Sequence, residues 1–503
     1  MQTSPKAQRI EIALLAAITL LARLFRLGWH PLWVDELYSH QVSAQSLGVI
    51  IRNSLYESHP PLYYILLKFS TLFNLWHSEI GLRWLSAAAG TAMIIVFYAI
   101  AVRLVDRRSA RILWFIMLLS PGMIFYGQEV RSYAVEILIA TITLWLVHGF
   151  TETANPSRRQ WMLWGAVSVM GVYLGYSYLL VFAAQALFLL WHFRRDRGVW
   201  ITLTLASLGI APLIPLLLKN LSNDINTVFI NIPLNVRFML AALLAGEPAR
   251  YGFFWGSVAL PVLIGLPALV GAVKLMGGRA GGGTPPLRGK FGAYLLLQIM
   301  IPLIVYFVII DRLLHIEMPN YQSRQFFVIL PALFLLVAHG FQTLHARLPK
   351  WVSNVYVVAA LLVIAAGSLF ALADYWNTTK SPEGQAARLV RAQLQPGDAV
   401  VSLGNSLDAA AGYYLPPGTP IYLAAQLTNN GYRFDDNPLI LREQVERAHP
   451  FSLEDVRAHP RIWILSDNRH VHPVVPLLTG GCLITLDELF PPFEVILVKH
   501  CAP

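Results

Sequence analysis

"LRWLSAAAGTAMIIVFYAIAVRL", residues 82–104, decides the fold class, together with "VDRRSAR", residues 105–111, which follows it directly. The first stretch has the length of a membrane-spanning helix, which needs about 20 mostly apolar residues. The basic cluster behind it is typical of the cytoplasmic end of such a span. The two stretches therefore predict a helix that crosses a membrane and ends in the cytoplasm.

The composition of the whole chain agrees with this interpretation. Its 503 residues are 56% hydrophobic and only 13% charged, and the mean hydropathy is +0.54. These values are atypical of a water-soluble globule and indicate a polytopic α-helical membrane protein. A barrel would show short alternating strands instead of continuous apolar runs. The net charge of +10 does not indicate a nucleic-acid partner, because the cations lie in short clusters between the apolar runs.

About eleven runs are long enough to predict spanning helices. They are residues 10–27, 82–104, 109–125, 132–150, 161–176, 178–193, 199–218, 253–275, 291–310, 326–344 and 351–373. Basic residues gather in alternate loops, for example at Arg107, Arg158 and Arg194, and these loops are predicted to be cytoplasmic. The N-terminus is then inside, and the odd number of spans places the C-terminal part outside the cytoplasmic membrane.

The apolar runs stop after Asp374. We therefore divide the chain into a transmembrane domain, residues 1–373, and a small α/β domain, residues 374–503. The strands predicted in this second domain are residues 399–403, 420–424, 461–465 and 493–500, and a helix opened by Ser-Pro is predicted at residues 381–394.

Both cysteines of the chain, Cys482 and Cys501, lie in this domain, which the predicted topology places in an oxidising compartment. They flank two strand-like runs joined by "LDELFPP", residues 486–492. One interpretation is a cross-strand disulfide that closes this hairpin. The alternative is two small buried apolar residues.

Two long outer connections, residues 28–81 and 219–252, separate the predicted spans. Loops of this length usually carry function. Residues 39–55 and 60–76 in the first connection are predicted to be amphipathic helices along the outer face of the membrane. Residues 233–246 in the second connection are too short to span and too apolar for water, so an interfacial helix is predicted there as well.

The first outer connection begins with "WVDELYSH", residues 33–40, which contains the adjacent acids Asp35 and Glu36. In a helix, neighbouring side chains point about 100° apart. Only one of the two carboxylates can then face a small site. The alternative interpretation is an N-cap followed by an acid in the first helical turn.

A second outer motif is "FYGQEVRSYAVE", residues 125–136. Glu129 and Arg131 can form an ion pair that holds a tight turn. In the other interpretation, donors from Tyr126, Gln128, Arg131 and Tyr133 gather where a helix begins, an arrangement suited to an anion.

A third outer motif, "YQSRQFF", residues 321–327, contains Arg324. This arginine can extend its side chain to the interface, or it can face inward and bind a phosphate bidentately. Ionisable groups at this depth cost several kcal/mol unless they are paired, roughly +2.5 or more each at a helix centre, so they are candidates for function. Together with His59, the acids and arginines of the three motifs predict chemistry on a lipid-linked phosphate.

Four stretches resemble, in order and spacing, the GT-C glycosyltransferases of the bacterial protein-O-mannosyltransferase and aminoarabinose (ArnT-like) transferase type. They are "VDELYS", "SHPPLYYILLKF", "FYGQEVRSYAVEILIAT" and "YQSRQFFVILPALFLLVA". The resemblance implies a GT-C fold and an inverting enzyme that uses a polyprenyl-phosphate monosaccharide as donor at the outer face of the membrane. It also implies that Asp35 is the catalytic base, with Glu36 as its partner.

The remaining roles follow the chemistry of this transfer. Arg131 and Arg324 would stabilise the charge of the departing phosphate. His59 and Glu129 would orient the acceptor, bind the sugar or hold a divalent metal ion. Further candidates for substrate binding are Tyr63, Tyr126, Gln128, Tyr133 and Tyr321. The acceptor is a lipid, a glycan or a protein, and these alternatives stay open.

Two other functions are compatible with parts of the pattern. A transporter or flippase would place ionisable and helix-breaking residues within the spans, as Glu136, Pro212 and Pro215 do, but no internal repeat accompanies them. A noncatalytic scaffold for envelope assembly would not require the candidate active-site residues Asp35 and Arg131, and the chain has both. The glycosyltransferase is the function that the sequence favours.

Overall fold

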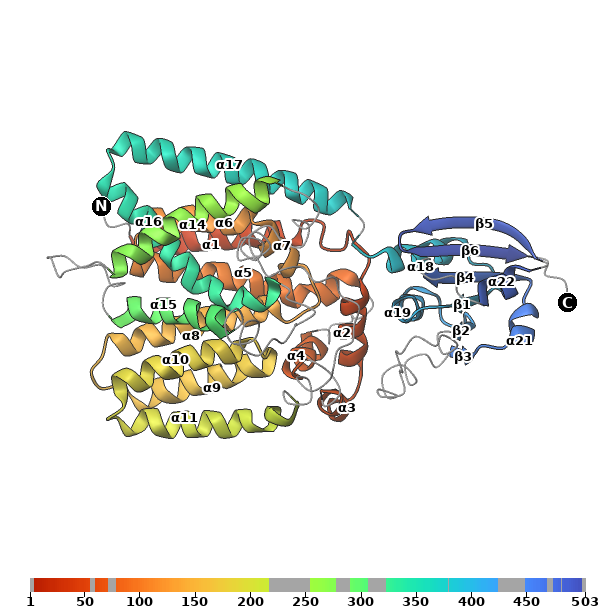
Figure 1. The fold of residues 1–503 in the computed structure, drawn as a ribbon, viewed down its shortest axis with the longest axis horizontal. Helices are drawn as coiled ribbons and strands as arrows, with labels where there is room; N and C mark the ends of the chain where they lie inside the picture. Colours follow the sequence, from red (N-terminus) through yellow and green to blue (C-terminus); the bar gives the residue numbers. More distant parts are fainter. Residues whose placement is uncertain are drawn as a thin grey trace. The chain divides into compact units, whose positions relative to one another are not determined.

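The computed structural model of the protein contains a set of long helices and a small C-terminal sheet (Figure 1). The structure describes residues 4–54, 59–70, 78–216, 254–276, 290–305, 323–378, 380–423, 448–467, 474–480 and 482–499. All described strands follow residue 398, and the long helices precede it. The predicted fold class, a polytopic helical protein with a C-terminal α/β part, is confirmed.

The long helices hold most of the chain before the sheet. They are α1 (Pro5–Leu24), α5 (Glu79–Leu104), α6 (Arg107–Leu119), α7 (Pro121–Gly127), α8 (Tyr133–Thr151), α9 (Arg158–Leu174), α10 (Tyr178–Phe193), α11 (Arg197–Ile210) with the short η1 (Ala211–Leu213), α14 (Phe254–Met276), α15 (Lys290–Ile304), η4 (Ser323–Ile329), α16 (Leu330–Arg347) and α17 (Lys350–Asn377). Several pairs pack together, among them α8 with α9, α10 with α15 and α14 with α16. At the last pair a Cβ on Gly340 would collide with the carbonyl oxygen of Pro267, the close backbone approach that small residues allow in membranes.

Each of the eleven predicted spans overlaps one of these helices. Among the described residues, five helices are long and apolar enough to cross a membrane, or six when the bent pair α6 and α7 counts as one. Three shorter apolar helices lie at Tyr178–Phe193, Leu263–Leu275 and Lys290–Ile304. The number of spans therefore stays a prediction, whereas the positions of the helices agree with it.

The predicted span 109–125 is not continuous, because the chain bends by 61° between α6 and α7. Pro121 has no N–H to continue the helix, and the side chain of Ser120 starts α7 by accepting a hydrogen bond from the N–H of Met123 at 3.3 Å. The buried guanidinium of Arg23 donates to the carbonyl oxygens of Leu118 at 3.1 Å and Met117 at 3.0 Å. These bonds satisfy the carbonyl groups that α6 leaves open at its end.

The first outer connection is helical, as predicted, but with different bounds. It contains α2 (Val34–Ala44), α3 (Leu47–Asn53) and α4 (Leu62–Ser70). The predicted helix 39–55 is split because Ser46 caps α3, its hydroxyl accepting a hydrogen bond from Val49 N–H at 3.4 Å. The interfacial helix predicted at residues 233–246 lies outside the described residues.

The C-terminal sheet has six strands in the order β3-β2-β1-β4-β6-β5. Their bounds are β1 Ala399–Ser402, β2 Ile421–Leu423, β3 Ala448–Pro450, β4 Arg461–Asp467, β5 Leu483–Phe490 and β6 Phe493–Lys499. The strands β3, β2, β1 and β4 pair in parallel, and β6 runs antiparallel to both β4 and β5. The four predicted strands and the predicted helix, α18 (Pro382–Gln393), are all present.

The hairpin β5–β6 corrects one detail of the sequence interpretation. Residues Leu486–Phe490 of "LDELFPP" belong to β5, so the turn between the strands is only Pro491 and Pro492. Cys482, just ahead of β5, is disulfide-bonded, while Cys501 lies outside the described residues. Their pairing stays a prediction.

Side chains alternate between the two faces of a strand, and both faces of the central strands carry buried residues. Val400 and Trp463 pack on one face with α18 and with α19 (Asn405–Tyr414). Val401 and Ile464 pack on the other face with α21 (Leu453–Arg457) and α22 (Val474–Thr479). The sheet is thus the central layer of a small three-layer domain.

The chain divides into two compact units. The first comprises residues 1–27, 57–66 and 83–375, and the second comprises residues 28–56, 67–82 and 376–503. Most of the first outer connection therefore belongs to the same unit as the sheet. Each unit is described below by itself.

Candidate active site

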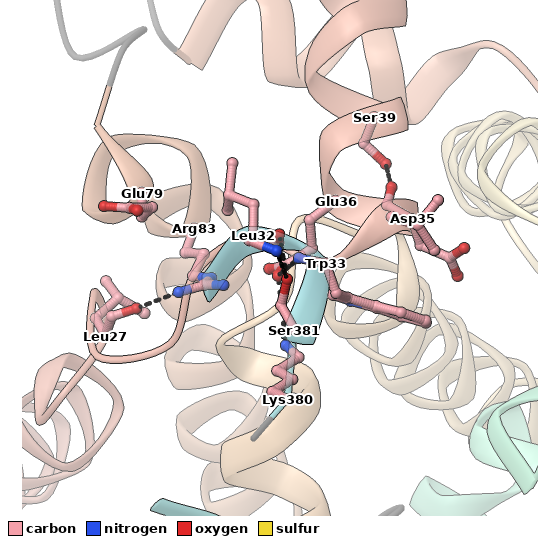
Figure 2. Close-up of polar contacts among 12 residues, drawn as sticks. Leu27, Leu32, Trp33, Asp35, Glu36, Ser39, Glu79, Arg83, Lys380 and Ser381 are labelled. Carbon is pink, nitrogen blue, oxygen red and sulfur yellow. Dashed lines mark hydrogen bonds and ion pairs between the residues drawn. The ribbon is translucent and has the colours of Figure 1, made fainter. Parts of the chain in front are cut away.

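Asp35 and Glu36 lie in the first turn of α2, in the second unit. Asp35 is half-buried, whereas Glu36 is completely buried. Figure 2 shows the Asp35 carboxylate pointing away from that of Glu36. The divergence is what helical geometry requires of adjacent side chains. Which of the two acids faces a substrate stays a prediction.

Glu36 is engaged with the protein on two sides. Its Oε2 accepts a hydrogen bond from the N–H of Trp33 at 3.4 Å, the return bond of a capping box at the start of α2. The same oxygen pairs with Nζ of Lys380 at 3.5 Å (Figure 2). A buried carboxylate needs such partners, because without them its loss of hydration is uncompensated.

Arg131 and His59, both in the first unit, are in direct contact. Nη2 of Arg131 is 3.3 Å from Nε2 of His59. A guanidinium has only donors, so in this contact Nε2 of His59 is the acceptor. Arg131 is 6% exposed, and a charge buried to that degree is a candidate for binding an anion.

The turn that carries Arg131 is bonded to the beginning of α5. The hydroxyl of Ser86 donates to the carbonyl oxygen of Arg131 at 3.2 Å, and the hydroxyl of Tyr63 lies 3.4 Å from that of Ser86. Tyr63 is thus brought to the same place as Arg131 and His59, as the sequence predicts for a common site.

Gln128 lies in the same turn but faces α1. Its side-chain nitrogen donates to the carbonyl oxygens of Arg23 at 2.9 Å and Phe25 at 2.8 Å. Both amide hydrogens are thus used next to the end of α1. Its role as a substrate ligand stays a prediction.

An aromatic cluster joins the Arg131 turn to η4. The ring of Phe327 in η4 lies 4.2 Å from Tyr126 and 6.1 Å from Tyr133, and the two tyrosine rings are 5.3 Å apart. Because Arg324 belongs to η4, the second and third outer motifs meet within the first unit. The Arg324 side chain and Tyr321 lie outside the described residues.

Glu129, between Gln128 and Arg131, is 1% exposed. Within the part of the chain that the structure describes, no three His, Cys, Asp or Glu residues come close enough to hold a metal ion. Glu129 and His59 keep the roles that the sequence suggests as predictions.

Several residues around α2 were not singled out from the sequence. Lys380, Ser381 and Glu383 follow the last predicted span, and their contacts with α2 are long-range. The only signal in the sequence is "KSPEG", residues 380–384, which marks a helix start. That pattern says nothing of the helix's partner.

The comparisons with known proteins agree with this architecture. Residues 58–218 match the family model described as dolichyl-phosphate-mannose-protein mannosyltransferase. No curated protein matches the chain. The family match includes His59, Tyr63, Glu129 and Arg131, whereas Asp35 and Arg324 lie outside it.

Solved structures resemble the chain over nearly its whole length. ArnT from Cupriavidus metallidurans in the apo state has a TM-score of 0.56 at 14% identity, covering 98% of this chain and 98% of that one. The same enzyme bound to undecaprenyl phosphate also has a TM-score of 0.56 at 14% identity, covering 97% of each chain. An oligosaccharyltransferase from Archaeoglobus fulgidus, tethered with an acceptor peptide, has a TM-score of 0.52 at 12% identity, covering 91% of this chain and 69% of that one. The predicted GT-C fold and the resemblance to these transferases are confirmed.

Proposed function

We propose that this protein with a GT-C fold is an inverting glycosyltransferase. It moves a monosaccharide from a polyprenyl-phosphate donor to an acceptor hydroxyl at the outer face of a bacterial cytoplasmic membrane. The observation that carries the proposal is the meeting of the Arg131 turn, His59 and η4 in the first unit. The fold shared with ArnT, one structure of which holds undecaprenyl phosphate, supports the class of donor.

Asp35 is the general base of the proposed reaction. The acceptor hydroxyl oxygen attacks the anomeric carbon on the face opposite the phosphate, and the bond from that carbon to the phosphate oxygen breaks. The hydroxyl proton passes to Asp35, and the sugar inverts its configuration. A positioned base of this kind contributes about 10²- to 10⁴-fold to the rate. Glu36 is its partner and holds the turn through Trp33 and Lys380.

Arg131 and Arg324 receive the departing polyprenyl phosphate. Negative charge grows on the phosphate as the bond breaks, and guanidinium groups in a site sheltered from water stabilise it strongly. His59, with Nε2 directed at Arg131, keeps the guanidinium oriented. Sugar and acceptor binding are assigned to Tyr63, Tyr126, Tyr133, Tyr321, Gln128 and Glu129. The acceptor is a lipid, a glycan or a protein.

The proposed location is the cytoplasmic membrane, with the N-terminus in the cytoplasm and residues 374–503 in the periplasm. The support for this orientation is the clustering of basic residues in alternate connections, for example at Arg107, Arg158 and Arg194. The outer leaflet is then where the donor is used.

The proposal is tested by mass spectrometry of envelope lipids, glycans and proteins from a deletion strain. We expect one sugar to be missing from its acceptor, while the polyprenyl-phosphate sugar accumulates, and the wild-type gene should reverse both changes. A flippase would also remove the sugar, but its donor would accumulate in the inner leaflet, out of reach of an enzyme added to spheroplasts. An envelope without any missing sugar would contradict both functions.

A further inference from the structure

The chain entering α2 is held by three side chains from beyond the last long helix, all within the second unit. The hydroxyl of Ser381 donates to the carbonyl oxygen of Leu32 at 2.8 Å, and Leu32 N–H donates to the hydroxyl of Tyr414 at 2.7 Å. Val34 N–H donates to Oε1 of Glu383 at 2.9 Å. These hydrogen bonds thus hold the backbone at Leu32 and at Val34, and Val34 directly precedes Asp35.

Glu383 differs from the other two because its carboxylate serves two helices. It lies in the first turn of α18, which Ser381 caps, and it also accepts the open N–H at the first turn of α2. Open N–H groups and the helix dipole both favour a negative charge at such positions. One carboxylate therefore joins the two helix beginnings.

The surroundings of Glu383 determine when it carries this charge. The side chain is 5% exposed. Its burial raises the pKa of Glu383 to about 7, the Glu36 carboxylate adds to the rise, and hydrogen bonds from backbone N–H groups, that of Val34 among them, oppose it. The other charged groups nearby are paired: Lys380 with Glu36, and Arg388, one turn along α18, with Glu79.

We propose that Glu383 is a positioning residue for Asp35: its carboxylate fixes the first turn of α2 and so directs the side chain at the next position. The inference rests on the proposed transfer reaction, to which it adds that the C-terminal part of the chain shapes the catalytic centre. A hydrogen bond to an ionised acceptor is about twice as strong as one to a neutral group. Ionised Glu383 therefore holds the turn more firmly than protonated Glu383.

A second set of contacts keeps the connection in place when Glu383 is altered. Glu79 pairs with Arg388 and accepts a hydrogen bond from the Tyr414 hydroxyl at 3.1 Å. The Arg388 guanidinium also lies 5.3 Å from the centre of the Tyr414 ring. A substitution at Glu383 is therefore expected to loosen the first turn of α2 without releasing the whole connection.

Hydrogen–deuterium exchange of the full-length protein in lipid nanodiscs tests the inference without any substrate. In E383A, exchange in peptides covering residues 33–44 should rise about tenfold, the factor for one hydrogen bond to a charged group. E383Q retains a hydrogen-bond acceptor, so exchange in the same peptides should rise less than in E383A. Peptides from β4 show whether the C-terminal domain stays folded. The matched control is E454Q, because Glu454 is an exposed acid in the first turn of α21. Unchanged exchange at residues 33–44 in E383A would overturn the inference.

The transfer rate supplies a second readout. We expect E383A to lower kcat about 10- to 100-fold, because the catalytic base is displaced. The KM for the sugar donor, once envelope analysis has identified that donor, should change little. The wild-type rate should rise with pH through about 7, where Glu383 ionises, and E383Q should lack this rise. An E383Q profile equal to the wild-type profile would overturn the inference. Absence of transfer by the wild type would instead refute the proposed function, whatever the exchange data show.

Discussion

At the scale of single residues, the adjacent acids Asp35 and Glu36 have different surroundings. Helical periodicity alone predicts that only one can face a site, and the structure shows them diverging (Figure 2). The pairing of Glu36 with Lys380 could not be predicted, because the two residues lie far apart in the sequence. The sequence pattern thus predicts that the two carboxylates diverge, and the assignment of Asp35 as the base stays a proposal.

The pair Glu36 and Lys380 is expected to show strong coupling. Both side chains are at least nine-tenths buried, with relative exposures of 0% and 7%. Glu36→Gln or Lys380→Met alone leaves one buried charge without its partner and should lower the free energy of unfolding by roughly 3 kcal/mol. The double variant should lose less than the sum of the single losses. Thermal unfolding of the purified wild type, the two single variants and the double variant measures these losses. If the two single losses simply add up in the double variant, the Glu36–Lys380 interaction contributes nothing to stability.

We expect the buried carboxyl group of Asp408 in α19 to make the free energy of unfolding depend on pH. Burial raises the pKa of Asp408 to about 7. The folded protein then holds this proton while the unfolded chain, with an ordinary aspartate pKa of about 3.9, has released it. Stability should therefore fall as pH increases from about 4 to 7.

Asp408→Asn should remove this part of the pH dependence and raise the melting temperature most at pH 8. Thermal unfolding of the full-length protein between pH 4 and pH 8 measures the effect. The control is Asp455→Asn at an exposed position of α21. A D408N protein with the same slope as the wild type would contradict the assignment.

At the scale of elements, apolar runs predict where helices lie but not where they break. The run at residues 109–125 is continuous in hydropathy, yet Ser120 and Pro121 divide it. The strands β1, β2, β4 and β6 are rich in β-branched and aromatic residues and could be predicted. Only the beginning of β5, before residue 486, could be predicted as strand-like, because "LDEL" places charged residues in a strand with many exposed positions. The strand β3 has only three residues and was not predicted.

The break between α6 and α7 should depend on Arg23. Its guanidinium bonds to the carbonyl oxygens of Met117 and Leu118. Arg23→Met keeps most of the volume but leaves these buried acceptors unpaired, which should cost about 1–3 kcal/mol. Arg26→Met, at an exposed position, is the control for loss of a nearby charge. A melting temperature equal to that of the wild type would show that other groups satisfy the two carbonyls.

At the scale of the whole molecule, the candidate residues belong to two compact units. Arg131, His59 and η4 belong to the first, while Asp35 belongs to the second, together with the sheet. The sequence predicts one common face from the topology of the spans. It could not predict that the connection carrying Asp35 is bonded to Ser381, Glu383 and Tyr414, because hydrogen bonds between distant segments leave no periodic signal.

The measurement that tests the central claim most directly is the transfer rate of Asp35→Asn at saturating polyprenyl-phosphate sugar. Asparagine keeps the size of the side chain but cannot accept the hydroxyl proton, so the rate should fall about 10²- to 10⁴-fold. The control is Asp374→Asn, an exposed carboxylate near the end of α17, which should transfer at the wild-type rate. Transfer by D35N at the wild-type rate would contradict the account.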